Sequence, residues 1–144
     1  MSHETHYRKL ERMYYSAPTN EYFAPKLTVS EGKSVVEIAV RDDFMHGAGS
    51  VHGCFYFKAM DDAAFFAVSS LVADEFVLTA SFNLYLTRPV AEGTLRAEGE
   101  VVHQSRRLFV AEARLTNDDG KELGRGSGTY MRSRMPLSAE MGYR

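Results

Sequence analysis

Apolar and polar residues alternate along much of the second half of the chain. The alternation is strictest over residues 76–87, where every second side chain is apolar, and it ends at Arg88 and Pro89. A period of two is typical of a β-strand that presents one face to a core. The strand signal begins at residue 27, and further strands are predicted over residues 36–40, 95–102, 108–115 and 122–131.

A tight turn is predicted between the last two of these strands. Residues 117–120 read Asn-Asp-Asp-Gly, and the pair Asp119 and Gly120 suits the positive backbone angles of the primed hairpin turns. The sequence therefore predicts a hairpin at this point. We expect the tail after residue 136 to be loose.

Two other stretches have the spacing of helices. Residues 3–17 place apolar side chains at helical intervals among charged neighbours and stop at Pro18, which predicts a short amphipathic helix. Residues 53–73 contain no proline or interior glycine and are apolar almost all round, which is typical of a buried helix. Five or six antiparallel strands must wrap around such a helix to bury it, so the sequence predicts an α+β fold.

Composition narrows the class of protein. A chain of 144 residues with 44% hydrophobic and 25% charged residues fits one compact domain over residues 1–144. A formal net charge of -2 argues against a nucleic-acid partner. The chain lacks a secretion signal and the roughly 18 consecutive apolar residues of a membrane span, so we expect a cytoplasmic protein that does not bind membranes. Cys54 is the one cysteine, which excludes a disulfide framework and a thiolate zinc site; no metal is predicted.

The predicted central helix carries two adjacent acids, Asp61 and Asp62, and one other charge, Lys58. An ionised carboxylate in apolar surroundings is costly unless it is paired or hydrogen-bonded. Neighbouring helix residues point about 100° apart, so the two acids cannot both face one cavity. One of them can serve in catalysis while the other binds backbone, solvent or a partner chain. A solvated or subunit-contact patch explains the pair equally well.

The start of the same helix is the second candidate for chemistry. His52, Gly53 and Cys54 open the helix directly after a loop that contains two glycines. The unpaired N–H groups and the positive dipole end of a helix N-terminus can stabilise a developing negative charge. Asp61 lies eight residues further on, about 12 Å along the helix axis. Close packing alone would also explain Gly53.

Two segments resemble motifs of one known family. Residues 51–64, VHGCFYFKAMDDAA, are similar to the helix-opening HGG…D…A motif of the hotdog-fold acyl-CoA thioesterases of the phenylacetate (PaaI-like) type. Residues 81–93, SFNLYLTRPVAEG, resemble that family's strand pattern N-x-Y-x-x-P-x-x-x-G. The similarity extends over residues 27–131. It implies a hotdog fold, an antiparallel sheet wrapped around one long central helix, here with a short N-terminal helix.

The resemblance also implies a mechanism. Asp61 takes the position of the family's catalytic carboxylate, which acts as a general base on water or as a nucleophile. Gly53 takes the position whose backbone N–H polarises the thioester carbonyl. Thr79 falls where some members carry a Ser or Thr that helps to hold the water. Family active sites form between two subunits, so we expect a homodimer or a dimer of dimers.

Two positions depart from the family pattern. His46 replaces the usual Asn, and we expect its ring to bind the carbonyl or the water, although an ordinary loop histidine is the alternative. Cys54 replaces the second glycine. A helix N-terminus favours a thiolate nucleophile, but a small buried residue that fills space is the preferred interpretation.

The remaining predictions concern the substrate. The residues expected to bind it are His52, Cys54, Asn83, Arg88, Arg106 and Arg107. Guanidinium groups suit the phosphates of coenzyme A, although a solvated hairpin end also explains the last two arginines, and His52 also fits a structural turn. The predicted function is an acyl-CoA thioesterase that needs no cofactor. The alternatives are a hotdog dehydratase or hydratase and a non-catalytic acyl-CoA binding or sensing domain.

Overall fold

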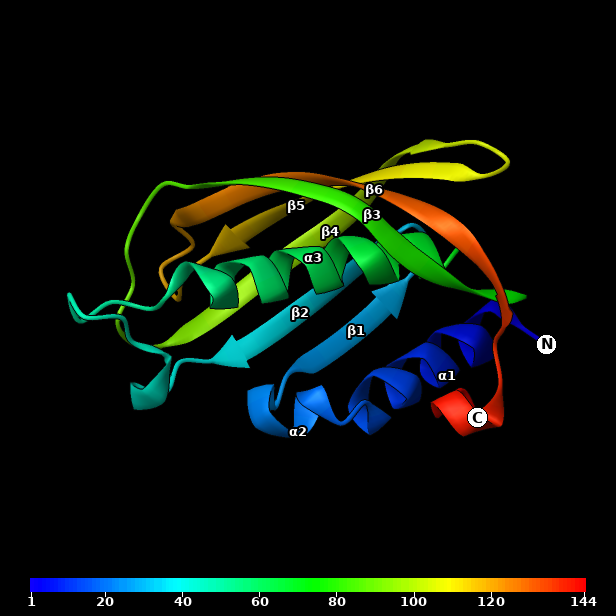
Figure 1. The fold of residues 1–144 in the computed structure, drawn as a ribbon, viewed down its shortest axis with the longest axis horizontal. Helices are drawn as coiled ribbons and strands as arrows, with labels where there is room; N and C mark the ends of the chain where they lie inside the picture. Colours follow the sequence, from blue (N-terminus) through cyan, green and yellow to red (C-terminus); the bar gives the residue numbers. More distant parts are fainter.

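A curved antiparallel sheet wraps around one long helix (Figure 1). The computed structural model describes residues 1–144. In chain order the elements are α1 (His3–Ser16), α2 (Thr19–Phe23), β1 (Lys26–Ser30), β2 (Lys33–Ala39), the 3-10 turn η1 (Asp42–Phe44), α3 (Gly53–Ser69), β3 (Glu75–Leu86), β4 (Thr94–Gln104), β5 (Leu108–Thr116), β6 (Glu122–Pro136) and the 3-10 turn η2 (Ala139–Met141). The predicted α+β architecture is confirmed. No helix combines the length and the apolar character that crossing a membrane requires.

The six strands follow the order β1-β2-β4-β5-β6-β3, so β1 and β3 form the two edges. Helix α1 covers the β1 edge with side-chain hydrogen bonds to its backbone. Glu11 accepts from the Val29 N–H at 2.8 Å, and the Tyr15 hydroxyl accepts from the Leu27 N–H at 2.9 Å. No element of the chain covers the outer edge of β3 in the same way. The sheet therefore has one protected edge and one free edge.

Helix α3 lies in close contact with the middle of the sheet. Ser34 of β2 and Gly99 of β4 are cross-strand partners, and both meet the helix backbone at Ala63. The Ser34 hydroxyl donates to the Ala63 carbonyl at 2.6 Å. A side chain at Gly99 would overlap that same carbonyl group and would lie 2.7 Å from the Ala64 nitrogen.

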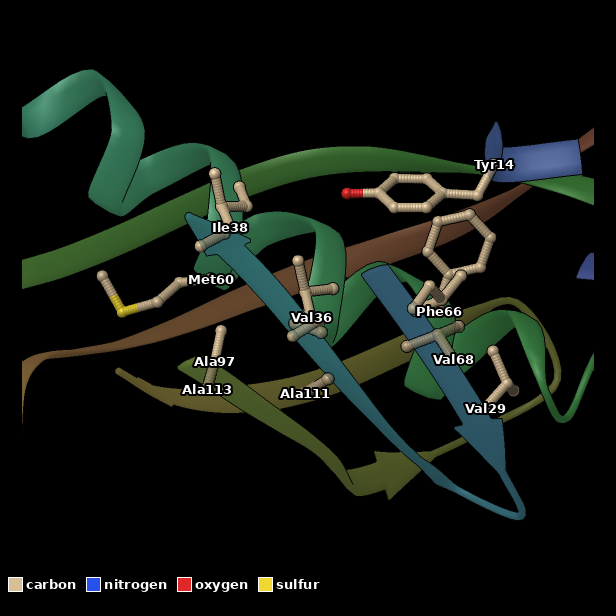
Figure 2. Close-up of a cluster of buried hydrophobic side chains, with 14 of the residues drawn as sticks. Tyr14, Val29, Val36, Ile38, Met60, Phe66, Val68, Ala97, Ala111 and Ala113 are labelled. Atoms are coloured by element: carbon tan, nitrogen blue, oxygen red, sulfur yellow. The ribbon is translucent and has the colours of Figure 1, made fainter. Parts of the chain in front are cut away.

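Alanine side chains extend this contact across the sheet. Ala97 of β4 and Ala111 and Ala113 of β5 are buried under α3 (Figure 2). Larger residues such as Ile38, Met60 and Phe66 fill the space on either side. A band of small residues thus allows the helix backbone to approach the strands directly, and the bulky side chains close the flanks.

Helix α3 is shorter than the predicted span of residues 53–73. It ends at Ser69, because the Ser70 hydroxyl donates to the Ala67 carbonyl at 2.6 Å and accepts from the Gly32 N–H at 2.8 Å. Side-chain hydrogen bonds of this kind compete with further helical bonding. Residues 70–74 then turn into β3.

Strand β3 does not keep the single alternation that its sequence predicts. Its pairing with β6 shifts between Thr79 and Ser81, which leaves Ala80 as the extra residue of a β-bulge. Val77 and Thr79 face the helix before the bulge, whereas Phe82 and Leu84 pack against the core after it. The prediction that the even-numbered apolar residues share one face along the whole strand is therefore wrong.

The turn between β5 and β6 is of a different type from the predicted one. Gly120 has a positive φ of 77°, but Asp119 does not, so the pair does not form a primed turn. The Asn117 side chain instead accepts hydrogen bonds from the backbone N–H groups of Asp119 and Lys121 at 3.0 and 2.9 Å. The hairpin is correct, and an Asn-organised turn closes it.

The C-terminal tail is packed rather than loose. The side chain of Tyr143 is buried against α1, and its hydroxyl lies 2.6 Å from Nδ1 of His6. The other ring nitrogen of His6 lies 2.9 Å from the Ser69 carbonyl, which requires that nitrogen to donate. Both ends of the chain therefore meet at the C-terminal end of α3 (Figure 1).

Replacing Gly99 by Ala should destabilise the protein, because the new methyl group cannot fit between β4 and the backbone of α3. We expect the free energy of unfolding to fall by about 2 kcal/mol or more, as for other overpacked cores. Urea titration followed by circular dichroism measures this. Gly47→Ala is the matched control, since a side chain there meets nothing within 4 Å and should change the same free energy by less than about 0.5 kcal/mol. Equal effects of the two substitutions would contradict the proposed close packing.

Candidate active site

Asp61 is held at the edge of a cavity by two hydroxyl groups. The Thr79 hydroxyl of β3 donates to Oδ1 of Asp61 at 3.1 Å, and the Tyr130 hydroxyl of β6 donates to the same oxygen at 3.0 Å. Thr79 and Tyr130 are cross-strand partners, so neighbouring positions of the sheet supply both donors. The β-bulge places Thr79 on the helix side of β3. Thr79, which the family resemblance places near the water, lies within hydrogen-bond distance of Asp61.

Asp62 has a different environment, although it is the next residue. Its Oδ2 accepts from the Tyr14 hydroxyl of α1 at 2.6 Å and forms an ion pair with Lys58 at 2.8 Å. The Lys58 ammonium also lies over the rings of Tyr14 and Phe23, 5.4 and 4.9 Å from their centroids. Asp62 therefore fastens the N-terminal helices to α3.

Burial raises the pKa of the Asp61 carboxyl above its ordinary value, and the charge of Asp62 raises it further. The hydrogen bonds from Tyr130 and Thr79 act in the opposite direction, since they favour the ionised form. Burial also raises the pKa of Asp62, against the opposing effect of Lys58. An acid with a raised pKa beside a cavity has the electrostatic character of a proton-transfer group.

The cavity next to Asp61 is mostly apolar. It has a volume of about 290 Å³ and lies between α1, α3 and β3. The apolar part of its lining consists of Met13, Tyr14, Ala17, Phe65, Phe66, Phe76 and Leu78. Asp61, Asp62, Lys58 and Thr79 lie together on its polar side.

A second cavity lies at the N-terminus of α3. It has a volume of about 340 Å³, and its lining includes His46, Gly53, Tyr56, Leu86 and Arg88. The Gly53 N–H makes no hydrogen bond within the chain, as expected for the first residue of a helix. A side chain at Gly53 would lie 2.9 Å from Leu86, so the helix start packs closely against the end of β3.

The predicted catalytic residues thus fall into two groups within one chain. Asp61 and Thr79 line the cavity between α1, α3 and β3, whereas Gly53 and His46 line the cavity at the helix N-terminus. His46 is exposed, and its Nδ1 accepts from the Ala48 N–H at 3.0 Å. Within this chain the two groups therefore line different cavities.

The structure decides between the alternative interpretations of His52 and Cys54 at the start of α3. His52 is the N-cap of α3, because its Nδ1 accepts from the Cys54 N–H at 3.0 Å. Cys54 is exposed, so its interpretation as a buried filler is wrong. The helical period explains this, since the next residues, Phe55 and Tyr56, are the ones that turn towards the core.

The other predicted substrate-binding residues are dispersed. Asn83 is exposed and points away from α3, because Phe82 and Leu84 on either side of it face the core. Arg88 lines the cavity at the helix N-terminus. Arg106 and Arg107 lie at the β4–β5 hairpin and line a separate cavity of about 600 Å³ with Arg132 and Arg134.

The roles of three residues at this site are not predicted from the sequence. Tyr14 and Tyr130 bind the two acids, and Lys58 forms an ion pair with Asp62. Lys58 is four residues before Asp62, which is the spacing of a helical ion pair and a usable signal. Tyr14 and Tyr130 come from distant segments, and no local pattern connects them with the two acids. No three His, Cys, Asp or Glu side chains are grouped so that they could hold a metal ion.

Comparisons with known proteins identify the family of this chain. A family model described as the thioesterase superfamily matches residues 48–123, more than half of the chain. A protein of Saccharolobus solfataricus, named as a candidate esterase, is 23% identical over 114 residues, which are 79% of this chain and 81% of that protein.

Solved structures extend the likeness to the whole fold. The PaaI protein from the phenylacetic acid degradation operon of E. coli matches with a TM-score of 0.85 and 22% identity, covering 94% of this chain and 98% of that one. A variant of the phenylacetic acid degradation protein PaaI from Thermus thermophilus matches with a TM-score of 0.73 and 25% identity, covering 81% and 99% of the two chains. The predicted PaaI-like hotdog fold is confirmed.

The raised pKa of Asp61 should make stability depend on pH. Because the folded state binds this proton more tightly than the unfolded state, stability is lost as pH rises from about 4, the ordinary Asp value, through the folded pKa. The side chain of Asp61→Asn does not ionise, so the variant lacks this pH dependence. The difference in the free energy of unfolding, variant minus wild type, should therefore increase between about pH 4 and 7, by about 1.4 kcal/mol for each unit by which folding raises the pKa of Asp61. Urea titrations at several pH values measure the difference.

The matched control for this measurement is Asp42→Asn. Asp42 is exposed and forms no ion pair, so the substitution changes the same chemical group without the burial. A stability difference for Asp61→Asn that stays constant with pH would contradict the raised pKa.

Proposed function

This chain belongs to the thioesterase superfamily, and from that premise we propose that it hydrolyses an acyl-CoA thioester to a free acid and coenzyme A. The observation that carries the proposal is the Asp61 carboxylate. It is held by two hydroxyl groups in the lining of an apolar cavity, and its pKa is raised. The free Gly53 N–H at the N-terminus of the same helix supports an oxyanion site.

In the proposed reaction, Asp61 acts on the thioester carbonyl directly or through water. As a general base, it takes one proton from a water molecule while the water oxygen attacks the carbonyl carbon. The Gly53 N–H donates to the oxygen that becomes negative in the tetrahedral intermediate. Collapse of the intermediate breaks the carbon–sulfur bond and releases coenzyme A as a thiolate. As a nucleophile, Asp61 would attack the carbonyl carbon and form an anhydride with the acyl group as the carbon–sulfur bond breaks and coenzyme A leaves as a thiolate; water then hydrolyses the anhydride to the free acid and restores the Asp61 carboxylate.

We assign the cavity beside Asp61 to the acyl group. Its aromatic and aliphatic lining suits an apolar ligand, and its volume of about 290 Å³ lies at the lower end of the range for small-molecule sites. Arg88, Arg106 and Arg107 are proposed to contact the phosphates of coenzyme A, with His46 near the carbonyl end. This arrangement needs no cofactor besides the substrate.

The proposed active site lies between two protomers. Asp61 and Gly53 line different cavities within one chain, so Asp61 of one protomer would act with Gly53 of the other. The free edge of β3 supports such a contact, because it carries unpaired backbone groups and exposes Tyr85 and Leu86 by 74% and 51%. A homodimer or a dimer of dimers would cover this edge.

Asp61→Asn should abolish most hydrolysis while Asp62→Asn should retain it. Loss of a general base lowers kcat by about a hundredfold or more, whereas Asp62 is engaged with Tyr14 and Lys58. Release of coenzyme A from a panel of acyl-CoA esters, followed with a thiol reagent, measures both variants. Equal losses for the two variants would contradict the role of Asp61. Tight binding of the esters without any release would identify a non-catalytic acyl-CoA binding domain instead.

Two inactive variants should restore each other if the site is shared. Asp61→Asn removes the carboxylate, and Gly53→Val blocks the N-terminal cavity beside Leu86. In a symmetric dimer, co-expression should recover roughly a quarter of wild-type activity, because half of the dimers are mixed and each mixed dimer keeps one intact site. Light scattering checks the oligomeric state. An active monomer, or no recovery in verified mixed dimers, would contradict the shared site.

A further inference from the structure

Tyr130 is a fully buried tyrosine whose hydroxyl contacts the proposed catalytic carboxylate. It lies on β6 with no exposed surface, and its hydroxyl is 3.0 Å from Oδ1 of Asp61. The same hydroxyl lies 3.4 Å from the Asp61 carbonyl, a longer and weaker contact. The carboxylate oxygen is therefore its principal acceptor.

The strand that carries Tyr130 is built to let the phenol reach this position. Gly128 precedes it by two residues and faces the same side of the sheet. A side chain at Gly128 would lie 2.7 Å from the Tyr130 hydroxyl and 2.6 Å from the ring of Phe82. Since glycine leaves this space empty, the Tyr130 ring can extend along β6 towards α3.

The hydrogen bonds around Asp61 are unequal between its two oxygens. Oδ1 receives both short bonds, from Tyr130 at 3.0 Å and from Thr79 at 3.1 Å. Oδ2 has one long contact, 3.5 Å from the Thr79 hydroxyl. A hydroxyl hydrogen can serve one acceptor well, so Oδ2 keeps its capacity to accept a proton.

From this asymmetry we propose that Tyr130 is a positioning residue for Asp61, an inference that rests on the proposed function. Its phenol anchors Oδ1 together with Thr79, holds the carboxylate in one orientation and directs Oδ2 towards the reacting water. Tyr130 itself transfers no proton and touches no substrate. It acts through the orientation and the ionisation of Asp61.

The charges around Asp61 give the phenol a second effect. Asp62 on the same helix disfavours the ionised form of Asp61, and Lys58 one turn earlier favours it. Of the groups on the facing strands, Thr79 and Tyr130 donate to the carboxylate and lower its pKa. Burial raises the pKa of Tyr130 itself, so the phenol stays protonated and remains a donor throughout the neutral range.

The test is the pH dependence of kcat/KM for Tyr130→Phe against wild type, measured with the acyl-CoA ester that wild type hydrolyses best. Loss of a donor to the ionised form should move the acid limb upward by about one pH unit, so that kcat/KM falls about tenfold on that limb. The plateau at higher pH should fall less. Tyr143→Phe is the matched control, since it removes a buried tyrosine hydroxyl that bonds His6 instead, and its acid limb should coincide with that of wild type.

Gly128→Ala provides a second variant that keeps the hydroxyl but displaces it. It should move the acid limb in the same direction, and combining it with Tyr130→Phe should add little further shift. An acid limb that stays in place in both variants, with activity lowered equally at every pH, would overturn the positioning role while leaving the thioesterase proposal intact. If wild type itself releases no coenzyme A, the thioesterase proposal fails first.

Discussion

The direct contact between the backbone of α3 and the backbone of β4 determines where the other parts of this protein can lie. Gly99 and Ser34 allow the helix to rest on the sheet at Ala63, two residues beyond Asp61. A helix held this close cannot rotate or slide without overlapping the strands. The orientation of Asp61 towards β3 and β6, and of Asp62 towards α1, follows from that fixed position.

Two adjacent and chemically identical residues thereby acquire different tasks. Helical geometry separates their directions by about 100°, and the close packing of α3 fixes which neighbour each one meets. Asp62 is neutralised by Lys58 and held by Tyr14, which suits an anchor. Asp61 receives hydroxyl donors only and keeps one oxygen largely free, which suits proton transfer. The difference lies in their surroundings, since the residue type is the same.

The general architecture could be predicted from the sequence because it depends on periodicity and on local signals. The buried helix, the long strands and the turn at Gly120 belong to this class. The bulge at Ala80 could not be predicted, because the apolar residues of β3 continue to alternate through it and only pairing with β6 reveals the shift. Tyr130 was missed for a similar reason: 69 residues separate it from Asp61, and only the folded sheet brings them together.

The bulge also limits insertions and deletions in β3. Adding or removing one residue within the strand would change which side chains face the helix, whereas the loops at its ends do not have this restriction. Before Ala80 the odd-numbered residues Val77 and Thr79 face the helix, whereas after it even-numbered residues do so. Two residues, Ala80 and Ser81, lie between Thr79 and Phe82, and in a regular strand this spacing would put the two side chains on opposite faces. The extra residue of the bulge allows both to lie on the helix side. A sequence comparison that aligned this strand without a gap against a relative with a regular strand would exchange inside for outside over half of its length. The bulge thus separates the part of the strand from which Thr79 reaches Asp61 from the part that packs Phe82 and Leu84 against the core.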